Sequence, residues 1–127
     1  MSHMPEKQTI LLVDDDSAIL EGARLRLRAS GYDTIDANEG GQGVAAAIKS
    51  RPDAIVMDVR MPRMDGLKAL SELQENAETR NIPVVMLSAS LMDQQNALDA
   101  GARFFLSKPY DGKNLVGAIK SAIGESS

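Results

Sequence analysis

The chain of 127 residues contains no cysteine and no tryptophan, and only one histidine. Without cysteine, disulfide bonds, thiol nucleophiles and zinc sites built on thiolates are excluded. The histidine, His3, lies in a start that resembles the remnant of an expression tag, ahead of the start-like pair Met4-Pro5. We therefore expect no acid–base catalysis by a native histidine.

Long apolar runs and excess positive charge are also missing. No run approaches the roughly 20 residues that cross a bilayer, and residues 1–8 are too polar for the core of a signal peptide. Acidic residues outnumber basic ones by 18 to 14, for a formal net charge of −4, whereas nucleic-acid-binding domains are usually basic. We expect a cytoplasmic protein that contacts neither nucleic acid nor membrane directly.

The length fits one domain, and Leu, Ile, Val and Phe make up about 24% of the residues, enough to form a core. We expect the folded domain to span residues 8–124. Residues 1–7 are then a tag remnant and N-terminal tail, and residues 125–127 a C-terminal tail.

Short aliphatic runs alternate with longer segments of helical period, which predicts an α/β fold built from five strand–helix pairs. Three of the runs are nearly unbroken and apolar, as in parallel strands buried on both faces by helices. The expected strands are residues 9–13, 33–37, 54–57, 84–88 and 103–106.

Two of the expected helices are unusual. The helix after residues 33–37 should begin late, near Gly43, because each glycine inside a helix costs about 1 kcal/mol relative to alanine. The segment 90–100 has a thin apolar stripe of Leu91, Ala97 and Leu98, so we expect a shallowly packed helix. At helix starts, Ser17 is expected to cap the first helix, and Ser90 with Asp93 resembles a capping box.

Acidic residues follow two of the expected strands, and right-handed crossovers place all strand carboxyl ends along one edge of the sheet. Asp14, Asp15 and Asp16 follow residues 9–13, and Asp58 follows residues 54–57. Carboxylates without cysteine or histidine are typical ligands of Mg²⁺ or Mn²⁺. An aspartate run before a helix can instead serve only as a cap, and we assign that role to Asp16.

Two further polar residues are expected at the same edge. Ser88 ends one strand, and Lys108 follows another and precedes Pro109, which favours an extended backbone at Lys108. A lysine, a hydroxyl, a carboxylate and a divalent metal together can support phosphoryl transfer to an aspartate. Lys108 as a charge-balancing surface residue is the alternative.

The sequence resembles the receiver domain of two-component response regulators over nearly its whole length, from Gln8 to about Ile123. The resemblance is carried by four segments that occur in the family's order and spacing. They are Ile10 to Asp16, Val56 to Gly66, Pro83 to Ala89, and Lys108-Pro109. The resemblance implies a flavodoxin-like, doubly wound sheet with strand order 2-1-3-4-5 and helices on both faces.

The resemblance also implies roles for the residues at this edge. Asp58 becomes the phosphoacceptor, while Ser88 and Lys108 contact the phosphoryl group. Mg²⁺, or Mn²⁺ in its place, is held by carboxylates and by one backbone carbonyl. These metal ligands are Asp14, Asp15, Asp58 and the carbonyl oxygen of Arg60.

A switch and a set of partners follow from the same resemblance. The phosphoryl group attracts Ser88, and Phe105 turns into the space that Ser88 leaves, which changes the surface of residues 90–100, 103–106 and the last helix. The expected partners are a sensor histidine kinase or a histidine phosphotransfer protein, and a downstream effector. Such a protein is not an enzyme with a separate substrate.

The loop from Met61 to Gly66 is expected to be a turn, with Pro62 fixing φ and Gly66 free to take a positive φ. Arg60 and Ser90 should flank the phosphoryl site. The residues alone do not decide whether Arg60 binds the phosphoryl group or restricts water.

Three alternative functions fit these residues less well than the receiver. A haloacid-dehalogenase-like phosphotransferase would use Asp14 as nucleophile, but its late acidic pair has no counterpart after Lys108. A flavodoxin-like nucleotide carrier needs backbone donors where this chain has three aspartates. A pseudo-receiver that serves only for interaction would not need five mutually costly polar groups at one edge.

Overall fold

A computed structural model describes residues 7–124, which form one five-stranded parallel sheet and five helices. The strand order is β2-β1-β3-β4-β5, so the predicted doubly wound α/β fold is confirmed. His3 and the tails at residues 1–6 and 125–127 lie outside the described residues. The elements are β1 (Thr9–Val13), α1 (Ser17–Ala29), β2 (Asp33–Ala37), α2 (Gly40–Ser50), β3 (Ala54–Asp58), α3 (Gly66–Glu75), β4 (Val84–Ser88), α4 (Asp93–Asp99), β5 (Phe104–Ser107) and α5 (Gly112–Ile123).

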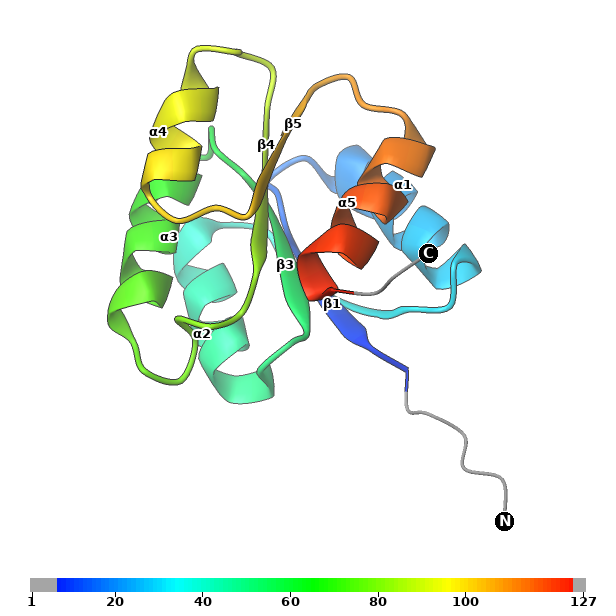
Figure 1. Ribbon diagram of the computed structural model, residues 1–127, viewed down its shortest axis with the longest axis horizontal. Coiled ribbons are helices and arrows are strands. Elements are labelled where there is room, and N and C mark those ends of the chain that lie inside the picture. The colour runs from blue at the N-terminus through cyan, green and yellow to red at the C-terminus, as the bar shows by residue number, and fades with distance from the viewer. Residues whose placement is uncertain (1–6, 125–127) are drawn as a thin grey trace.

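The sheet lies between two layers of helices. Figure 1 shows α1 and α5 on one face, and α2, α3 and α4 on the other. Successive strand residues point to opposite faces, so Ile10 and Leu12 pack toward α1 and α5, whereas Leu11 and Val13 pack toward the other helices. The protein therefore has two hydrophobic cores, one on each face of the sheet.

The central strands are the buried ones. Every residue of β3 and β4 is buried, and so are four of the five residues of β1, as the apolar runs predicted. The edge strands β2 and β5 are partly exposed. Strand β3 extends one residue further than predicted, to Asp58, and β5 begins and ends one residue later than predicted.

Helix α2 begins at Gly40, so the expected late start near Gly43 was wrong. The glycines are needed for close packing. A Cβ atom at Gly40 would lie 2.5 Å from the carbonyl oxygen of Met64, and one at Gly43 would lie 2.9 Å from the Val13 side chain. The side chain of Glu39 accepts a hydrogen bond from the Gln42 backbone N–H and caps the helix. Packing and capping thus outweigh the low helix propensity of glycine.

The helix caps differ from two predictions. Asp16 caps α1 by accepting hydrogen bonds from the Ala18 and Ile19 backbone N–H groups, as assigned, and Ser17 is instead the first helical residue. Helix α4 begins only at Asp93, and the predicted capping box with Ser90 was wrong because the Asp93 carboxylate binds elsewhere.

The predicted shallow packing of α4 is confirmed. The predicted apolar stripe of Leu91, Ala97 and Leu98 was only partly correct. Ala97 is buried, but the Leu91 side chain is 67% exposed and that of Leu98 is 38% exposed.

Among the residues that the structure describes, none of the helices combines the length and apolar character that crossing a bilayer requires.

Candidate functional site

The strand register places the polar residues at the carboxyl ends of β1, β3, β4 and β5 at one edge of the sheet. Asp58 pairs with Leu87, and Ser88 is therefore one residue further along the neighbouring strand. Ser88 in turn pairs with Ser107, and its carbonyl oxygen accepts the Lys108 backbone N–H at 2.8 Å. The fold thus brings together side chains that are up to 94 residues apart in the chain.

Three aspartates and a lysine form the centre of this edge. One carboxylate oxygen from each of Asp14, Asp15 and Asp58 lies within 4.8 Å of the others. Asp14 and Asp58 are buried, whereas Asp15 is exposed. The Lys108 ammonium lies 3.1 Å from Asp58 Oδ2 and 3.3 Å from Asp14 Oδ2, so Lys108 is not a surface residue that merely balances charge.

The charges of this cluster are unevenly matched. Burial raises the pKa of Asp14, and burial together with the Asp14 charge raises the pKa of Asp58. Burial alone would lower the pKa of Lys108, but Asp58 and Asp14 outweigh it and raise that pKa. One ammonium faces three carboxylates, and the open side at Asp15 leaves carboxylate oxygens free to bind a cation. The donor set therefore fits a hard divalent metal.

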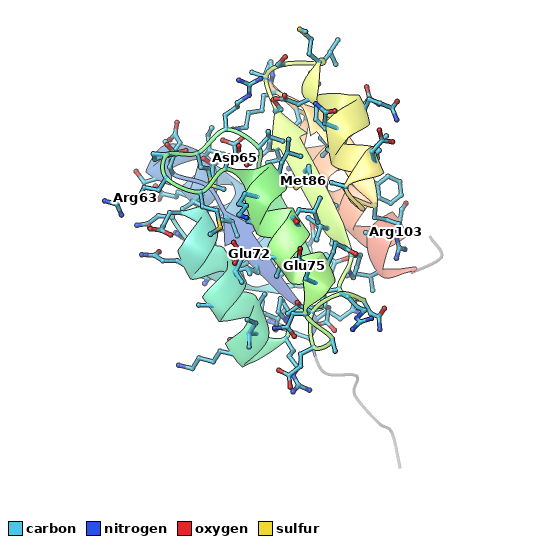
Figure 2. All side chains as sticks on the ribbon, turned by 90° about the vertical axis from the view of Figure 1, so that its left-hand side faces the viewer. Arg63, Asp65, Glu72, Glu75, Met86 and Arg103 are labelled. Atoms are coloured by element: carbon cyan, nitrogen blue, oxygen red, sulfur yellow. The ribbon has the colours of Figure 1, made fainter. Side chains whose placement is uncertain are left out.

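The loop between β3 and α3 is packed tightly against Asp58. A Cβ atom at Gly66 would lie 2.2 Å from the Asp58 carbonyl oxygen and 2.8 Å from Met86 Cε. The expectation of a positive φ at Gly66 was wrong, because Gly66 is helical and the positive φ, 68°, falls at Arg63. Figure 2 shows Arg63 extended away from this loop and Asp65 at the start of α3. Glycine is required at position 66 because a larger residue there would collide with the backbone of Asp58.

Ser88 is fully buried, and its hydroxyl group donates a hydrogen bond of 2.6 Å to Asp93 Oδ2. The Arg60 guanidinium donates to both oxygens of the same carboxylate, each at 3.0 Å. These Arg60 hydrogen bonds, and then that of Ser88, lower the pKa of Asp93. Arg60 therefore pairs with Asp93 in this structure, a contact that the sequence had not predicted.

Phe105 lies on β5 and is partly buried against the core on the side of α2, α3 and α4. Asp16 stays outside the cluster as a helix cap, and its backbone N–H donates to Asp14 Oδ1 at 2.9 Å. The Arg60 side chain points to Asp93, and its carbonyl oxygen remains the predicted metal ligand.

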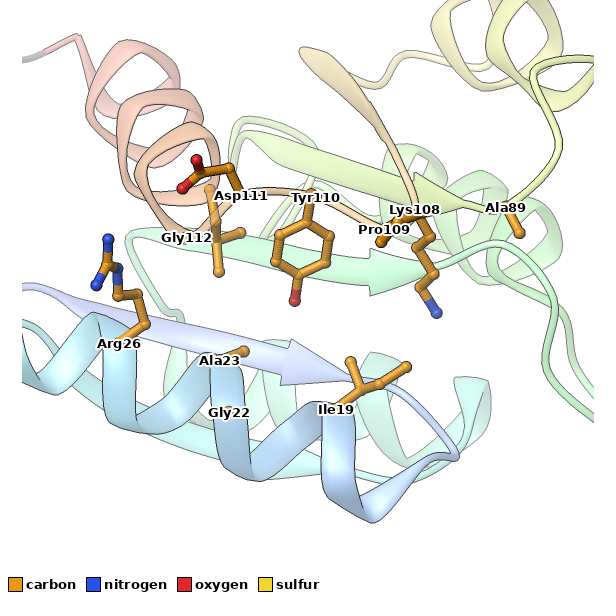
Figure 3. A pocket seen from close by; sticks show the side chains of 11 residues that line it. Ile19, Gly22, Ala23, Arg26, Ala89, Lys108, Pro109, Tyr110, Asp111 and Gly112 are labelled. Atoms are coloured by element: carbon orange, nitrogen blue, oxygen red, sulfur yellow. The ribbon is translucent and has the colours of Figure 1, made fainter.

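A groove of about 730 Å³ opens beside Lys108, between α1 and the segment that leads from β5 into α5. Figure 3 shows the Tyr110 ring above Ile19 and Ala23 of α1, with Lys108 at one end of the groove and Arg26 at the other. Burial raises the pKa of the Tyr110 hydroxyl group.

Sequence reasoning missed two residues of the site. Asp93 was assigned to a capping box, and its spacing of five residues from Ser88 matches no simple motif. Tyr110 was not considered, although it directly follows Lys108-Pro109. Its position after those residues could have indicated that it lies near the lysine.

A family model described as the response regulator receiver domain matches residues 10–120. The chain belongs to the response regulator receiver domain family. The predicted family is thereby confirmed, and with it a role as a signalling module of two-component systems.

Solved structures of similar chains support the family and the fold. The receiver domain of a sensor histidine kinase from Pseudomonas aeruginosa PAO1, with a magnesium ion coordinated in its active-site cleft, is 34% identical, with a TM-score of 0.87. That comparison covers 94% of this chain and all of the other. The chemotaxis protein CheY4 of Vibrio cholerae is 28% identical, with a TM-score of 0.86, over 92% of this chain and 99% of that one.

Curated relatives are longer than this chain. The DNA-binding dual master transcriptional regulator RpaA of Synechocystis is 34% identical over 116 residues, which cover 90% of this chain and 48% of that protein. The chain thus spans about half the length of such receiver-containing relatives.

Proposed function

We propose that Asp58 accepts a phosphoryl group from a phosphohistidine of a partner protein, and that residues 8–124 form the receiver domain that does so. The observation that carries this proposal is the placement of Asp58 at the end of a buried strand, 3.1 Å from the Lys108 ammonium and beside two further carboxylates. An acidic cluster that holds a half-buried lysine is suited to a reaction in which negative charge moves onto it.

In the proposed step, a carboxylate oxygen of Asp58 attacks phosphorus, and the bond between phosphorus and the histidine nitrogen breaks with its electron pair left on that nitrogen. Asp58 needs no general base, because its ionised form is already the nucleophile. Lys108 remains a fixed cation beside the transferred oxygens, and Ser88 supplies a hydroxyl donor. The chain acts as an acceptor and turns over no separate substrate.

The carboxylates of Asp14, Asp15 and Asp58, with the Arg60 carbonyl oxygen, are the proposed ligands of Mg²⁺, and Mn²⁺ fits the same donors. When bound, the metal supplies positive charge that offsets the charge of the phosphoryl oxygens. Support comes from the Pseudomonas receiver domain, whose cleft holds a magnesium ion. The open, exposed position of Asp15 gives the ion an entry path.

The proposed response to phosphorylation is a move of Ser88 toward the phosphoryl group and a turn of Phe105 into the space that it vacates. Phe105 is partly buried against the core near α4, so a change of its rotamer would alter the surface of α4, β5 and α5. A downstream effector is proposed to bind this surface.

The proposed donor is a sensor histidine kinase or a histidine phosphotransfer protein, which would approach along the groove that ends at Lys108. The name of the Synechocystis relative includes DNA binding, but this chain matches only 48% of that protein. With a net charge of −4, these 127 residues are not expected to contact nucleic acid themselves.

The test is the intact mass of the protein after incubation with acetyl phosphate and Mg²⁺. Wild-type protein should gain one phosphoryl group, and Asp58→Asn and EDTA-treated protein should gain none. Asp99→Asn, which removes an exposed carboxylate on α4, is the matched control and should behave as wild type.

The rival functions give different results in the same experiment. A haloacid-dehalogenase-like mechanism would keep the modification in Asp58→Asn and lose it in Asp14→Asn. A pseudo-receiver would show neither modification nor Mg²⁺ binding, and either result would overturn the proposal.

A further inference from the structure

The Ser88 hydroxyl group is already engaged before any phosphoryl group arrives. A serine hydroxyl has one proton to donate, and Ser88 donates it to Asp93 Oδ2 at 2.6 Å, the length of a charge-assisted bond. The same oxygen atom of Ser88 accepts the Ser90 backbone N–H at 3.0 Å. In this arrangement the hydroxyl cannot donate to a phosphoryl oxygen on Asp58.

Arg60 is engaged by the same carboxylate. Its Nε and Nη2 atoms donate to the two oxygens of Asp93 in a bidentate pair, while most of the Arg60 side chain remains exposed. Asp93 itself is only 6% exposed, although it belongs to the shallow helix α4. One buried carboxylate thus holds two donors that flank the acidic edge.

We infer that Asp93 holds the Ser88 hydroxyl and the Arg60 guanidinium in the unphosphorylated protein, in direct competition with the phosphoryl group on Asp58. The inference rests on the proposed acceptor role of Asp58. Asp93 is a positioning residue, since it acts through Ser88 and Arg60. A phosphoryl group carries nearly two negative charges and several acceptor oxygens, so it is a stronger competitor for both donors than an empty site.

The competition links the chemistry to the start of α4. Asp93 is the first residue of α4, and the exposed apolar side chains of Leu91 and Met92 immediately precede it. When the phosphoryl group takes Ser88 and Arg60, Asp93 loses its partners, and the segment from Leu91 to Asp93 is released from the end of β4. A protein that binds the released segment would, by linkage, favour phosphorylation.

The experiment measures the dissociation constant of beryllofluoride, a non-covalent phosphoryl mimic, in the presence of Mg²⁺. Asp93→Ala should bind the mimic about five- to tenfold more tightly than wild type, because both donors are free. Asp93→Asn should also bind it more tightly, because its neutral amide oxygen accepts their hydrogen bonds more weakly than a carboxylate does. Asp99→Asn removes a charge from the same helix and should bind as wild type. Unchanged or weaker binding by both Asp93 variants would overturn the inference.

Removal of a nearby negative charge could also tighten binding, and a second background separates the two causes. In protein that carries Ser88→Ala and Arg60→Gln, Asp93→Ala should change the dissociation constant by less than about twofold. A gain of the same size in that background would show that Asp93 acts only by charge repulsion, and the competition would be wrong.

A measurement on the variant without metal or mimic, referred to the spectrum of wild type with the mimic bound, gives independent support. The amide resonance of Ser90 reports the hydrogen bond to Ser88 Oγ, and it should shift in Asp93→Asn toward its position in wild type saturated with beryllofluoride. A shift in another direction would contradict the inference.

If wild-type protein binds no beryllofluoride, the acceptor role of Asp58 fails and the competition fails with it. Binding that is insensitive to Asp93 leaves the acceptor role intact and overturns only the competition.

Discussion

Helices α4 and α5 both pack beside β5, but they are attached to the sheet by different interactions. Helix α5 buries four residues, including the fully buried Leu115 and Ile119. Helix α4 buries only Asp93 and Ala97, and one of these is a carboxylate held by Arg60 and Ser88. Apolar burial holds α5, whereas α4 depends to a large extent on an ion pair and a hydrogen bond.

This difference explains how a charged group could move one helix and leave the other in place. Hydrophobic contacts do not respond to a new charge, but hydrogen bonds to Asp93 compete with any other acceptor near Arg60 and Ser88. The element attached by polar contacts is therefore the one that a phosphoryl group could release. Three pairs of substitutions test the comparison.

The largest effect is expected from the apolar contacts of α5. Ile119→Ala should lower the free energy of unfolding by about 2–5 kcal/mol, because it leaves a cavity at a fully buried position. Leu98→Ala on α4 should change it by less than about 0.5 kcal/mol, since that side chain is 38% exposed. Urea unfolding of both variants measures the difference, and similar losses would mean that α4 is packed as firmly as α5.

The second prediction compares two buried carboxylates whose pKa values move in opposite directions. The pKa of Asp58 is raised by burial, so its contribution to stability is present below the ordinary value of 3.8 and is lost as pH rises through the folded value. The pKa of Asp93 is lowered by Arg60 and Ser88, so its contribution is present above 3.8 and is lost as pH falls through the folded value.

In EDTA at about pH 7, Asp58→Asn should therefore be more stable than wild type and Asp93→Asn less stable, each by about 1–2 kcal/mol. The gain in Asp58→Asn should shrink as pH falls toward about 4, while the loss in Asp93→Asn should persist until pH is lower still. Unfolding curves measured across this range provide the test. Equal pH profiles for the two variants would show that the two carboxylates share one environment. Added Mg²⁺ should remove the advantage of Asp58→Asn by stabilising only wild type.

The sequence predicted the elements and the shared edge well, because both follow from local pattern and chain topology. Apolar runs identify buried strands, and parallel strands necessarily bring Asp14, Asp58, Ser88 and Lys108 to one edge. The roles of Asp58 and its neighbours depended on the family resemblance and stay predictions until they are tested.

The errors arose where tertiary contacts outweigh local preference. Gly40 and Gly43 weaken a helix in isolation, but here they allow α2 to approach Met64 and Val13 closely. Asp93 has the spacing of a helix cap, yet it pairs with Arg60, which lies 33 residues earlier in the chain. Local sequence patterns link residues only a few positions apart. The pair of Arg60 and Asp93 could therefore be found only in the folded structure.

The smallest expected effect on stability is the difference between Arg60 and Arg63. Both arginines lie in the loop between β3 and α3, and each is paired with a carboxylate. Arg63 bonds to Glu39 at 3.3 Å with its own side chain 82% exposed, whereas Arg60 makes a bidentate pair with the buried Asp93. Arg60→Gln should lower the free energy of unfolding by about 1 kcal/mol, and Arg63→Gln by less than about 0.5 kcal/mol. High salt should weaken the smaller effect further, because exposed pairs are screened more than buried ones. Thermal unfolding of the two variants at low and high salt would show the ranking, and equal losses would mean that burial of Asp93 adds nothing to its pair with Arg60.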